Sequence, residues 1–213
     1  MPDGDGSVAV ARALLEADTV TIRPDEPVTF SSGLRSPVYV DNRRLIFHPG
    51  PWRAVIDAFH DRLRERPLEV DVVAGVEAAG IPHSSALAFA AGLPSVFVRK
   101  LAREHGLARR IEGGDVSGRR VILVEDLVTT GSSSLSAVAA LRDAGAIVSF
   151  CLAIISYGFG SMRTAFDAAG VTLQVLTTFE TLVSEGVASG RLDARSADIV
   201  RAWLADPHAW AAS

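Results

Sequence analysis

The chain has 213 residues, of which 48% are hydrophobic, and its formal net charge at neutral pH is -4. This length and composition predict a soluble globular protein with one well-buried domain, and they leave little room for a second. A net acidic chain is a poor fit to proteins that bind nucleic acid by neutralising its phosphates, so small-molecule ligands are favoured.

Cysteine content and hydropathy indicate the compartment. The single cysteine, Cys151, lies in the apolar run of residues 148–155 and is expected in the core, with no disulfide within the chain. Residues 1–6 show no signal-peptide pattern, and no apolar run is long enough to span a membrane. We therefore expect a cytoplasmic protein.

The N-terminal segment predicts a small cap, or hood. Residues 8–17 have apolar side chains at helical spacing, with Ser7 as the expected N-cap. Short alternating runs between residues 19 and 44, broken by proline and glycine, indicate small antiparallel strands. Residues 51–66 then predict an amphipathic helix with a proline at its start.

Strands and helices alternate through the rest of the chain. We expect strands at residues 70–75, 95–98, 120–125, 147–155 and 172–176, and helices at residues 81–91, 134–144 and 162–169. This alternation predicts an α/β fold with a Rossmann-like, mostly parallel sheet flanked by helices. The tail at residues 196–210 predicts a helix that ends before Pro207. We expect residues 1–50 to form the hood and residues 51–213 the core, together as one compact domain.

The strongest functional signal is VILVEDLVTTGSSS, residues 121–134. An apolar strand leads into Glu125 and Asp126, and then into a turn rich in hydroxyls that opens a helix. Helix N-termini bind phosphates, and ligands of open α/β sheets lie outside the carboxyl ends of the strands. Because carboxylates repel phosphate, we expect the two acids to contact hydroxyls of a sugar that carries the phosphate. An ordinary strand followed by a capped helix is the alternative, and the ATPase loop pattern is absent.

Three other segments could complete such a site. GVEAAG, residues 75–80, is a turn whose two glycines allow close ligand approach, although an ordinary loop would look the same. Residues 99–118 lack an apolar period and concentrate positive charge, which fits a solvated loop or a mobile cationic lid over a polyphosphate. Residues 32–41, SGLRSPVYVD, could form only tight turns with Tyr39 in the core, or a platform for a planar base.

Together these segments resemble a known family. VILVEDLVTTGSSS resembles the phosphoribosyl-pyrophosphate signature of type I phosphoribosyltransferases, while VTFSSGLRSPVYVD and RKLAREHG resemble the orotate phosphoribosyltransferase branch. The resemblance covers nearly the whole chain. It implies the type I phosphoribosyltransferase fold with a small N-terminal hood. It also implies an enzyme that transfers the phosphoribosyl group from 5-phosphoribosyl 1-pyrophosphate to orotate, giving orotidine 5′-monophosphate and pyrophosphate in pyrimidine biosynthesis.

Roles for individual residues follow from this resemblance. It assigns catalysis to Arg103, Glu125 and Asp126, the two acids holding the ribose hydroxyls. The residues that match the phosphoribosyl-pyrophosphate site are Glu77, Ala78, Ala79, Gly80, Arg99, Lys100, His105, Thr129, Thr130, Gly131, Ser132 and Ser133. The residues expected at the orotate site are Ser32, Gly33, Arg35, Tyr39, Thr129 and Tyr157.

The resemblance also implies the partners of the chain. Mg²⁺ is the expected cofactor, bound to substrate oxygens and water with few protein ligands. The expected assembly is a homodimer whose active sites are shared, because in the family the lid comes from the neighbouring subunit. Neither nucleic acid nor membrane is an expected partner.

The chain departs from the family pattern at three places. Arg103 stands where the family usually has a catalytic lysine, and arginine keeps the charge but does not readily release a proton. Ser31 stands where some members have lysine, and Ser156 with Tyr157 replaces an Asp-Arg pair that contacts the base in many members. Two alternatives therefore stay open: a phosphoribosyltransferase for a different base, and a non-catalytic nucleotide-sensing regulator on the same fold.

Overall fold

The computed structural model of the chain describes residues 4–30, 33–65, 70–100 and 110–211. The contacts divide the chain into unit 1, residues 1–54 and 177–213, and unit 2, residues 55–176. Helix α2 (Pro49–Arg64) crosses the boundary between the units. Among the described helices, none is both long and apolar enough to cross a bilayer.

Unit 2 is built on a sheet of six strands. They are β5 (Val72–Val76), β6 (Ser95–Val98), β7 (Ile111–Glu112), β8 (Arg120–Val128), β9 (Ile147–Ser156) and β10 (Thr172–Val175). Their order is β10-β9-β8-β5-β6-β7, and every neighbouring pair is parallel except β6 and β7. The central strands β5 and β8 are apolar because both faces of a parallel sheet are covered. The predicted α/β fold with a mostly parallel sheet is confirmed.

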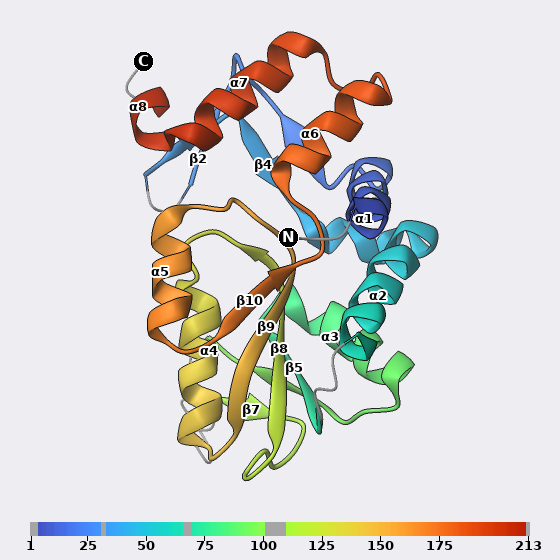
Figure 1. Cartoon of the computed structure of the whole chain (residues 1–213), viewed down its shortest axis with the longest axis vertical. Coiled ribbons are helices and arrows are strands. Elements are labelled where there is room, and N and C mark those ends of the chain that lie inside the picture. The colour runs from blue at the N-terminus through green and yellow to red at the C-terminus, as the bar shows by residue number, and fades with distance from the viewer. Residues whose placement is uncertain (1–3, 31–32, 66–69, 101–109, 212–213) are drawn as a thin grey trace. The chain divides into compact units, whose positions relative to one another are not determined.

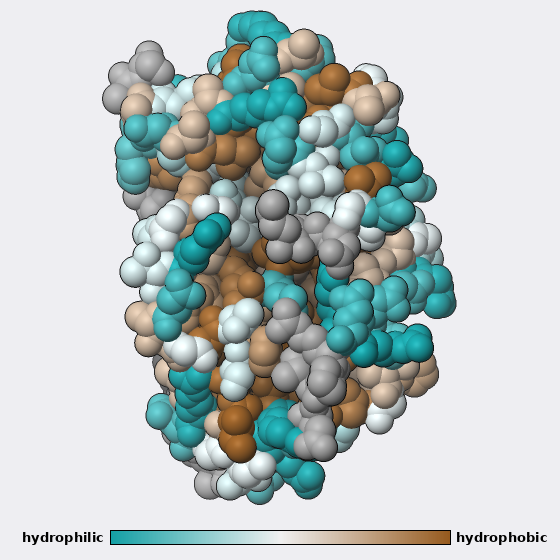
Figure 2. All heavy atoms as spheres, viewed as in Figure 1, coloured by the Kyte–Doolittle hydropathy of each residue, from teal (hydrophilic) through white to brown (hydrophobic). Residues whose placement is uncertain are grey.

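Helices cover both faces of this sheet. They are α3 (Gly80–Ala91), α4 (Ser132–Asp143) and α5 (Gly160–Ala168), together with most of α2. Figure 1 shows α4 and α5 on one side of the sheet and α2 and α3 on the other. The core between α4 and the sheet contains Leu123, Leu141 and the fully buried free Cys151, as expected for that cysteine. The surface over α2 is hydrophilic (Figure 2), because the helix buries only one face, with Val55 and Phe59.

Unit 1 consists of the N-terminal and the C-terminal segments of the chain. Its elements are α1 (Gly4–Glu16), β1 (Val20–Ile22), β2 (Val28–Thr29), β3 (Arg35–Ser36), β4 (Val38–Val40), the 3-10 helix η1 (Asn42–Phe47), α6 (Phe179–Ala188), α7 (Ala194–Ala205) and α8 (Pro207–Ala211). β1 pairs with β4 and β2 with β3, both antiparallel, which confirms the predicted small antiparallel strands. The buried Trp203 of α7 donates its indole N–H to the Arg35 carbonyl oxygen at 2.9 Å. The C-terminal segment thus packs on the hood strands, whereas the sequence grouped it with the core.

Outside the sheet, one prediction was wrong and two helices were not predicted. Ser7 does not cap α1; it lies inside the helix and donates its hydroxyl to Thr177 Oγ1 at 3.1 Å. Helix α6 was not predicted, although Thr178 caps it by accepting the Thr181 N–H at 3.2 Å. The expected tail helix is α7, which ends before Pro207 as predicted, but Pro207 also begins the further helix α8, which was not predicted.

Three predictions inside the core also need correction. β8 does not end at Glu125, because its pairing with β9 continues to Val128 and Ser156. α4 begins two residues earlier than expected, with Gly131 at its N-cap and the serines inside its first turn. Part of the segment of residues 99–118 is ordered, because β7 pairs with β6 and Val116 is buried.

Candidate active site

The carboxyl end of β8 carries Glu125 and Asp126, called here the acid pair. Glu125 is buried, with 6% of its surface exposed, because its side chain faces α4. The Ser134 hydroxyl donates to Glu125 Oε2 at 3.4 Å, and the Asp126 N–H donates to Glu125 Oε1 at 3.3 Å. The acid pair is therefore held by the first turn of α4 and by its own backbone.

The environment of Glu125 favours its protonated form. Burial raises the pKa of Glu125 well above its usual value, and repulsion by the neighbouring Asp126 raises this pKa further. Two adjacent carboxyls of this kind resist carrying two full charges. The acid pair can therefore both donate and accept hydrogen bonds, which suits the paired hydroxyls of a sugar.

Residues 129–133, called here the hydroxyl turn, connect β8 to α4. Gly131 has φ +85°, a backbone conformation that disfavours side chains, and a Cβ there would lie 2.7 Å from Phe166 Cε2. The N-cap residue Gly131 has no side chain with which to cap α4; Thr130 Oγ1 accepts the Ser132 N–H at 3.4 Å and lies 3.0 Å from Ser132 Oγ. N–H groups and exposed hydroxyls at a helix N-terminus form a site for a phosphate.

Residues 77–80, called here the Glu77 loop, connect β5 to α3. The peptide bond between Glu77 and Ala78 is cis. Gly80 lies against β8 so closely that a Cβ would be 2.7 Å from the Val124 carbonyl oxygen. Because β5 and β8 are parallel neighbours, the Glu77 loop and the hydroxyl turn leave the same edge of the sheet.

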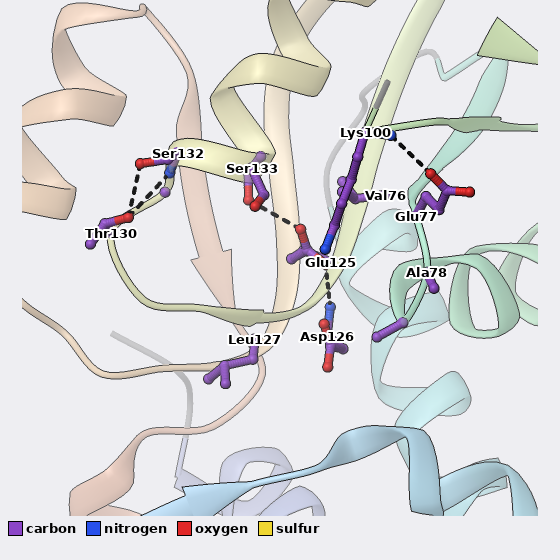
Figure 3. Close-up of a pocket in the computed structure, with 13 residues that line it drawn as sticks. Val76, Glu77, Ala78, Lys100, Glu125, Asp126, Leu127, Thr130, Ser132 and Ser133 are labelled. Carbon is purple, nitrogen blue, oxygen red and sulfur yellow. Dashed lines mark hydrogen bonds between the residues drawn. The ribbon is translucent and has the colours of Figure 1, made fainter. Parts of the chain in front are cut away.

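The acid pair, the hydroxyl turn and the Glu77 loop surround one cavity of about 180 Å³. It is lined by Val76, Glu77, Ala78, Ala79, Lys100, Glu125, Asp126, Leu127, Thr130, Gly131, Ser132, Ser133 and Ser134. Figure 3 shows the Lys100 side chain running toward Glu125 between Ser133 and the Glu77 loop. The cavity thus offers a cation, two acids and a phosphate site side by side.

Positive charge extends beyond Lys100 into an adjoining cavity of about 290 Å³. Arg99 and Arg110 line it together with hydroxyls from the first turns of α4. Arg110 donates to the Arg99 carbonyl oxygen at 2.9 Å and to the Ser136 carbonyl oxygen at 3.2 Å. These contacts hold Arg99 and Arg110 together and join Arg110 to α4.

Most of the residues that line the cavity, but not all of them, are predicted by the sequence. The cavity brings together Glu77, Ala78, Ala79, Lys100, Glu125, Asp126, Thr130, Gly131, Ser132 and Ser133 from the predicted set. Val76, Leu127 and Ser134 also line it and were not predicted. Ser134 could have been found from its place in the first turn of the helix, where its hydroxyl can face the preceding strand.

The other predicted residues lie elsewhere or are not described. Arg103, His105 and Ser32 lie outside the described residues. Arg35 and Tyr39 are exposed residues of unit 1, as is Gly33 with φ +84°. In unit 2, Thr129 begins the hydroxyl turn and Gly80 begins α3.

An aromatic pair follows the carboxyl end of β9. Tyr157 is buried, and its ring stacks on Phe159 with centroids 5.6 Å apart and planes 10° from parallel. The Tyr157 N–H donates to the Val128 carbonyl oxygen at 3.2 Å, so this pair lies next to the end of β8. Phe159 was not predicted as part of a site.

Comparison with known proteins agrees with this geometry. Residues 47–166 match the phosphoribosyl transferase domain family. The chain is 38% identical over 201 residues to an orotate phosphoribosyltransferase of Bacillus caldolyticus, covering 94% of this chain and 97% of that protein.

Solved structures give the same result. Leishmania donovani UMP synthase matches with a TM-score of 0.82 and 29% identity, over 95% of this chain but 42% of that protein. The orotate phosphoribosyltransferase of Mycobacterium tuberculosis in complex with 5-phospho-alpha-D-ribosyl 1-diphosphate matches with a TM-score of 0.67 and 28% identity, over 83% and 98% of the two chains.

Proposed function

This chain belongs to the orotate phosphoribosyltransferase family, and from that premise we propose that it transfers the phosphoribosyl group of 5-phosphoribosyl 1-pyrophosphate to orotate. The products are orotidine 5′-monophosphate and pyrophosphate. The observation that carries the proposal is the single cavity shared by the acid pair, the hydroxyl turn and the Glu77 loop. Each of these parts suits one part of phosphoribosyl pyrophosphate.

The hydroxyl turn binds the 5-phosphate in this proposal. Its N–H groups and the hydroxyls of Thr129, Thr130, Ser132 and Ser133 donate to phosphate oxygens, and Gly131 lets the backbone approach. The acid pair binds the ribose hydroxyls. The Glu77 loop receives the pyrophosphate through the backbone of Ala78, Ala79 and Gly80, and a M. tuberculosis relative has been solved with this substrate.

The charges around the cavity suit the reaction. Displacement of pyrophosphate by a ring nitrogen of orotate builds positive charge on the ribose and negative charge on the leaving group. The negative charge of the acid pair stabilises the ribose, and Lys100 and Arg99 stabilise the pyrophosphate, with Arg103 and His105 added by the family resemblance. A closed site would also keep water away from the activated ribose.

Magnesium is proposed as the cofactor, carried by the substrate. The acid pair supplies hard oxygen donors at the cavity wall, which fits Mg²⁺ held mainly by substrate phosphates and water. Across the described ranges, no group of three or more His, Cys, Asp or Glu side chains is arranged to hold a metal. When bound, Mg²⁺ would neutralise charge on the pyrophosphate.

The family resemblance is the source of the residues that we propose to contact orotate. Thr129 and Tyr157 lie at the carboxyl ends of neighbouring strands in unit 2, and the Tyr157 ring offers an aromatic surface. Ser32, Gly33, Arg35 and Tyr39 come from the hood, where Arg35 is the candidate partner of the orotate carboxylate.

We propose a homodimer with shared active sites. Helix α3 has no Lys, Arg, Asp or Glu along its length, and its Phe89 is 91% exposed. An apolar helix with an exposed phenylalanine suits contact with another chain, and a second copy is the occupant that the family resemblance supplies. The cytoplasmic location expected from the sequence stays a prediction.

The direct test is product formation. Purified protein is incubated with phosphoribosyl pyrophosphate, Mg²⁺ and orotate, and orotidine 5′-monophosphate and pyrophosphate are quantified. The proposal predicts equal amounts of the two products, and only when all three components are present. No orotidine 5′-monophosphate above background would overturn it.

A further inference from the structure

Both carboxylate oxygens of Glu77 face the residues at the end of β6. Oε2 accepts a hydrogen bond from the Lys100 backbone N–H at 2.9 Å, and Oε1 lies 4.0 Å from Arg99 Nε. The Glu77 N–H in turn donates to the Val98 carbonyl oxygen at 3.0 Å. Backbone and side chain of Glu77 therefore both bind the segment that leads to Lys100.

This orientation does not suit a direct substrate contact. Figure 3 shows the Glu77 carboxylate turned to the Lys100 backbone, while the Lys100 side chain runs to the Glu125 side of the cavity. A carboxylate would also repel pyrophosphate at short range. The remaining residues of the Glu77 loop, Ala78 to Gly80, have no charged side chain with which to bind an anion.

We propose that Glu77 is a positioning residue, which fixes the backbone at Lys100 so that the Lys100 ammonium is presented to the pyrophosphate. The inference rests on the proposed function, whose site it deepens. The lysine side chain has four rotatable bonds, so its ammonium group occupies a defined position only when the backbone of that lysine is fixed. The 2.9 Å bond to an ionised acceptor supplies that restraint.

The pair with Arg99 is the weaker half of the contact. Arg99 also lies 3.8 Å from Glu112 Oε1, so it keeps a second carboxylate if Glu77 is removed. Arg99 and Glu77 side chains are 30% and 32% exposed, and ion pairs of this length in water contribute little. The Lys100 N–H bond is therefore expected to carry the effect, and Glu112→Gln is the matched control that weakens an Arg99 pair while leaving the Glu77 bond to the Lys100 N–H in place.

The experiment compares Glu77→Ala, Glu77→Gln, Glu112→Gln, Lys100→Ala and the double variant Glu77→Ala/Lys100→Ala. The dissociation constant of Mg²⁺-phosphoribosyl pyrophosphate is measured by calorimetry, and KM and kcat with orotate are measured alongside. Loss of one charge-assisted hydrogen bond predicts about a tenfold weaker affinity for Glu77→Ala. Glu77→Gln, whose amide oxygen can still accept the N–H, should stay within about threefold of wild type, and so should Glu112→Gln.

The double variant distinguishes positioning from contact. If Glu77 acts through Lys100, adding Glu77→Ala to Lys100→Ala weakens binding no further. The inference would be overturned if the loss of affinity in the double variant equalled the product of the losses in the two single variants. It would also be overturned if Glu77→Gln bound as weakly as Glu77→Ala, and either result would indicate a direct role of the Glu77 charge. If Glu77→Ala does not fold, Glu77→Asp, which is one methylene too short for the bond, takes its place with the same expectations. Orotate turnover by the wild type tests the proposed function separately, whatever the variants do.

Discussion

The Ser134 hydroxyl donates a hydrogen bond to the buried Glu125 carboxylate at 3.4 Å. This contact joins the first turn of α4 to the end of β8, so the hydroxyl turn is held in a fixed position relative to the acid pair. The sugar and phosphate subsites of the proposed substrate are thereby placed by one rigid strand-turn-helix element.

Asp126→Asn should lower kcat with orotate by about 100-fold or more, because it removes the negative charge that stabilises the developing positive charge on the ribose. Steady-state kinetics measure the change, and the melting temperature checks the fold. Asp143→Asn, an exposed change at the end of α4, serves as the control and should leave kcat unchanged. Near-normal turnover of Asp126→Asn would contradict the assignment.

Gly131→Ala should abolish tight binding of phosphoribosyl pyrophosphate and lower stability by about 1–3 kcal/mol, because φ +85° disfavours alanine and the new methyl would meet Phe166. Gly170→Ala is the matched control. Gly170 also has a positive φ of 62°, but a Cβ there would meet nothing within 4 Å. The free energy of unfolding of Gly170→Ala should fall by about 1 kcal/mol, while its KM for phosphoribosyl pyrophosphate stays unchanged. An equal change of this KM in both variants would count against a phosphate site at Gly131.

Local sequence was sufficient for the five parallel strands of the sheet and for the acid pair, but not for the antiparallel strand β7. β5 and residues 121–124 of β8 are continuous apolar runs, and the change from such a run to Glu125 and Asp126 places the acid pair near the carboxyl end of β8, although the strand itself continues to Val128. The packing of Trp203 on the Arg35 carbonyl could not be predicted, because it joins residues 168 positions apart. The orientation of Glu77 depends on a backbone contact with Lys100, which residue types do not encode.

Stability should fall below pH 6.5 because of His83. Burial lowers the pKa of His83 from 6.5 to about 4, so the folded protein keeps it neutral while the unfolded chain protonates it. The stability that it contributes is complete above pH 6.5 and is lost as the pH falls toward 4. From pH 7.5 to pH 5 this amounts to about 2 kcal/mol.

Urea unfolding at the two pH values checks this. The pH-dependent loss should be about 2 kcal/mol smaller in His83→Gln than in wild type. Replacement of the exposed His208 by Gln should leave the loss unchanged. The same loss in His83→Gln and wild type would show that His83 does not titrate differently in the folded state.

Arg103→Ala should lose most activity, because the family resemblance gives this residue the catalytic cation of the lid. Mixing Arg103→Ala protein with Asp126→Asn protein tests whether active sites are shared. If the neighbouring subunit supplies Arg103, a heterodimer contains one site with both residues intact, and activity should recover to about one quarter of wild type in an equal, fully exchanged mixture. No recovery after verified subunit exchange would argue that each chain completes its own site.

The claim that this family member acts on orotate is tested most directly by competition among bases. Wild-type protein, phosphoribosyl pyrophosphate and Mg²⁺ are incubated with orotate, uracil, adenine or hypoxanthine, and kcat/KM is determined for each base from the nucleotide formed. The account predicts that orotate exceeds every other base by at least about 100-fold, since a site built to pair with a carboxylate rejects bases that lack one. Tyr157 stands where many family members have a charged residue that contacts the base. An equal or higher kcat/KM for another base would contradict the assignment of orotate as the substrate.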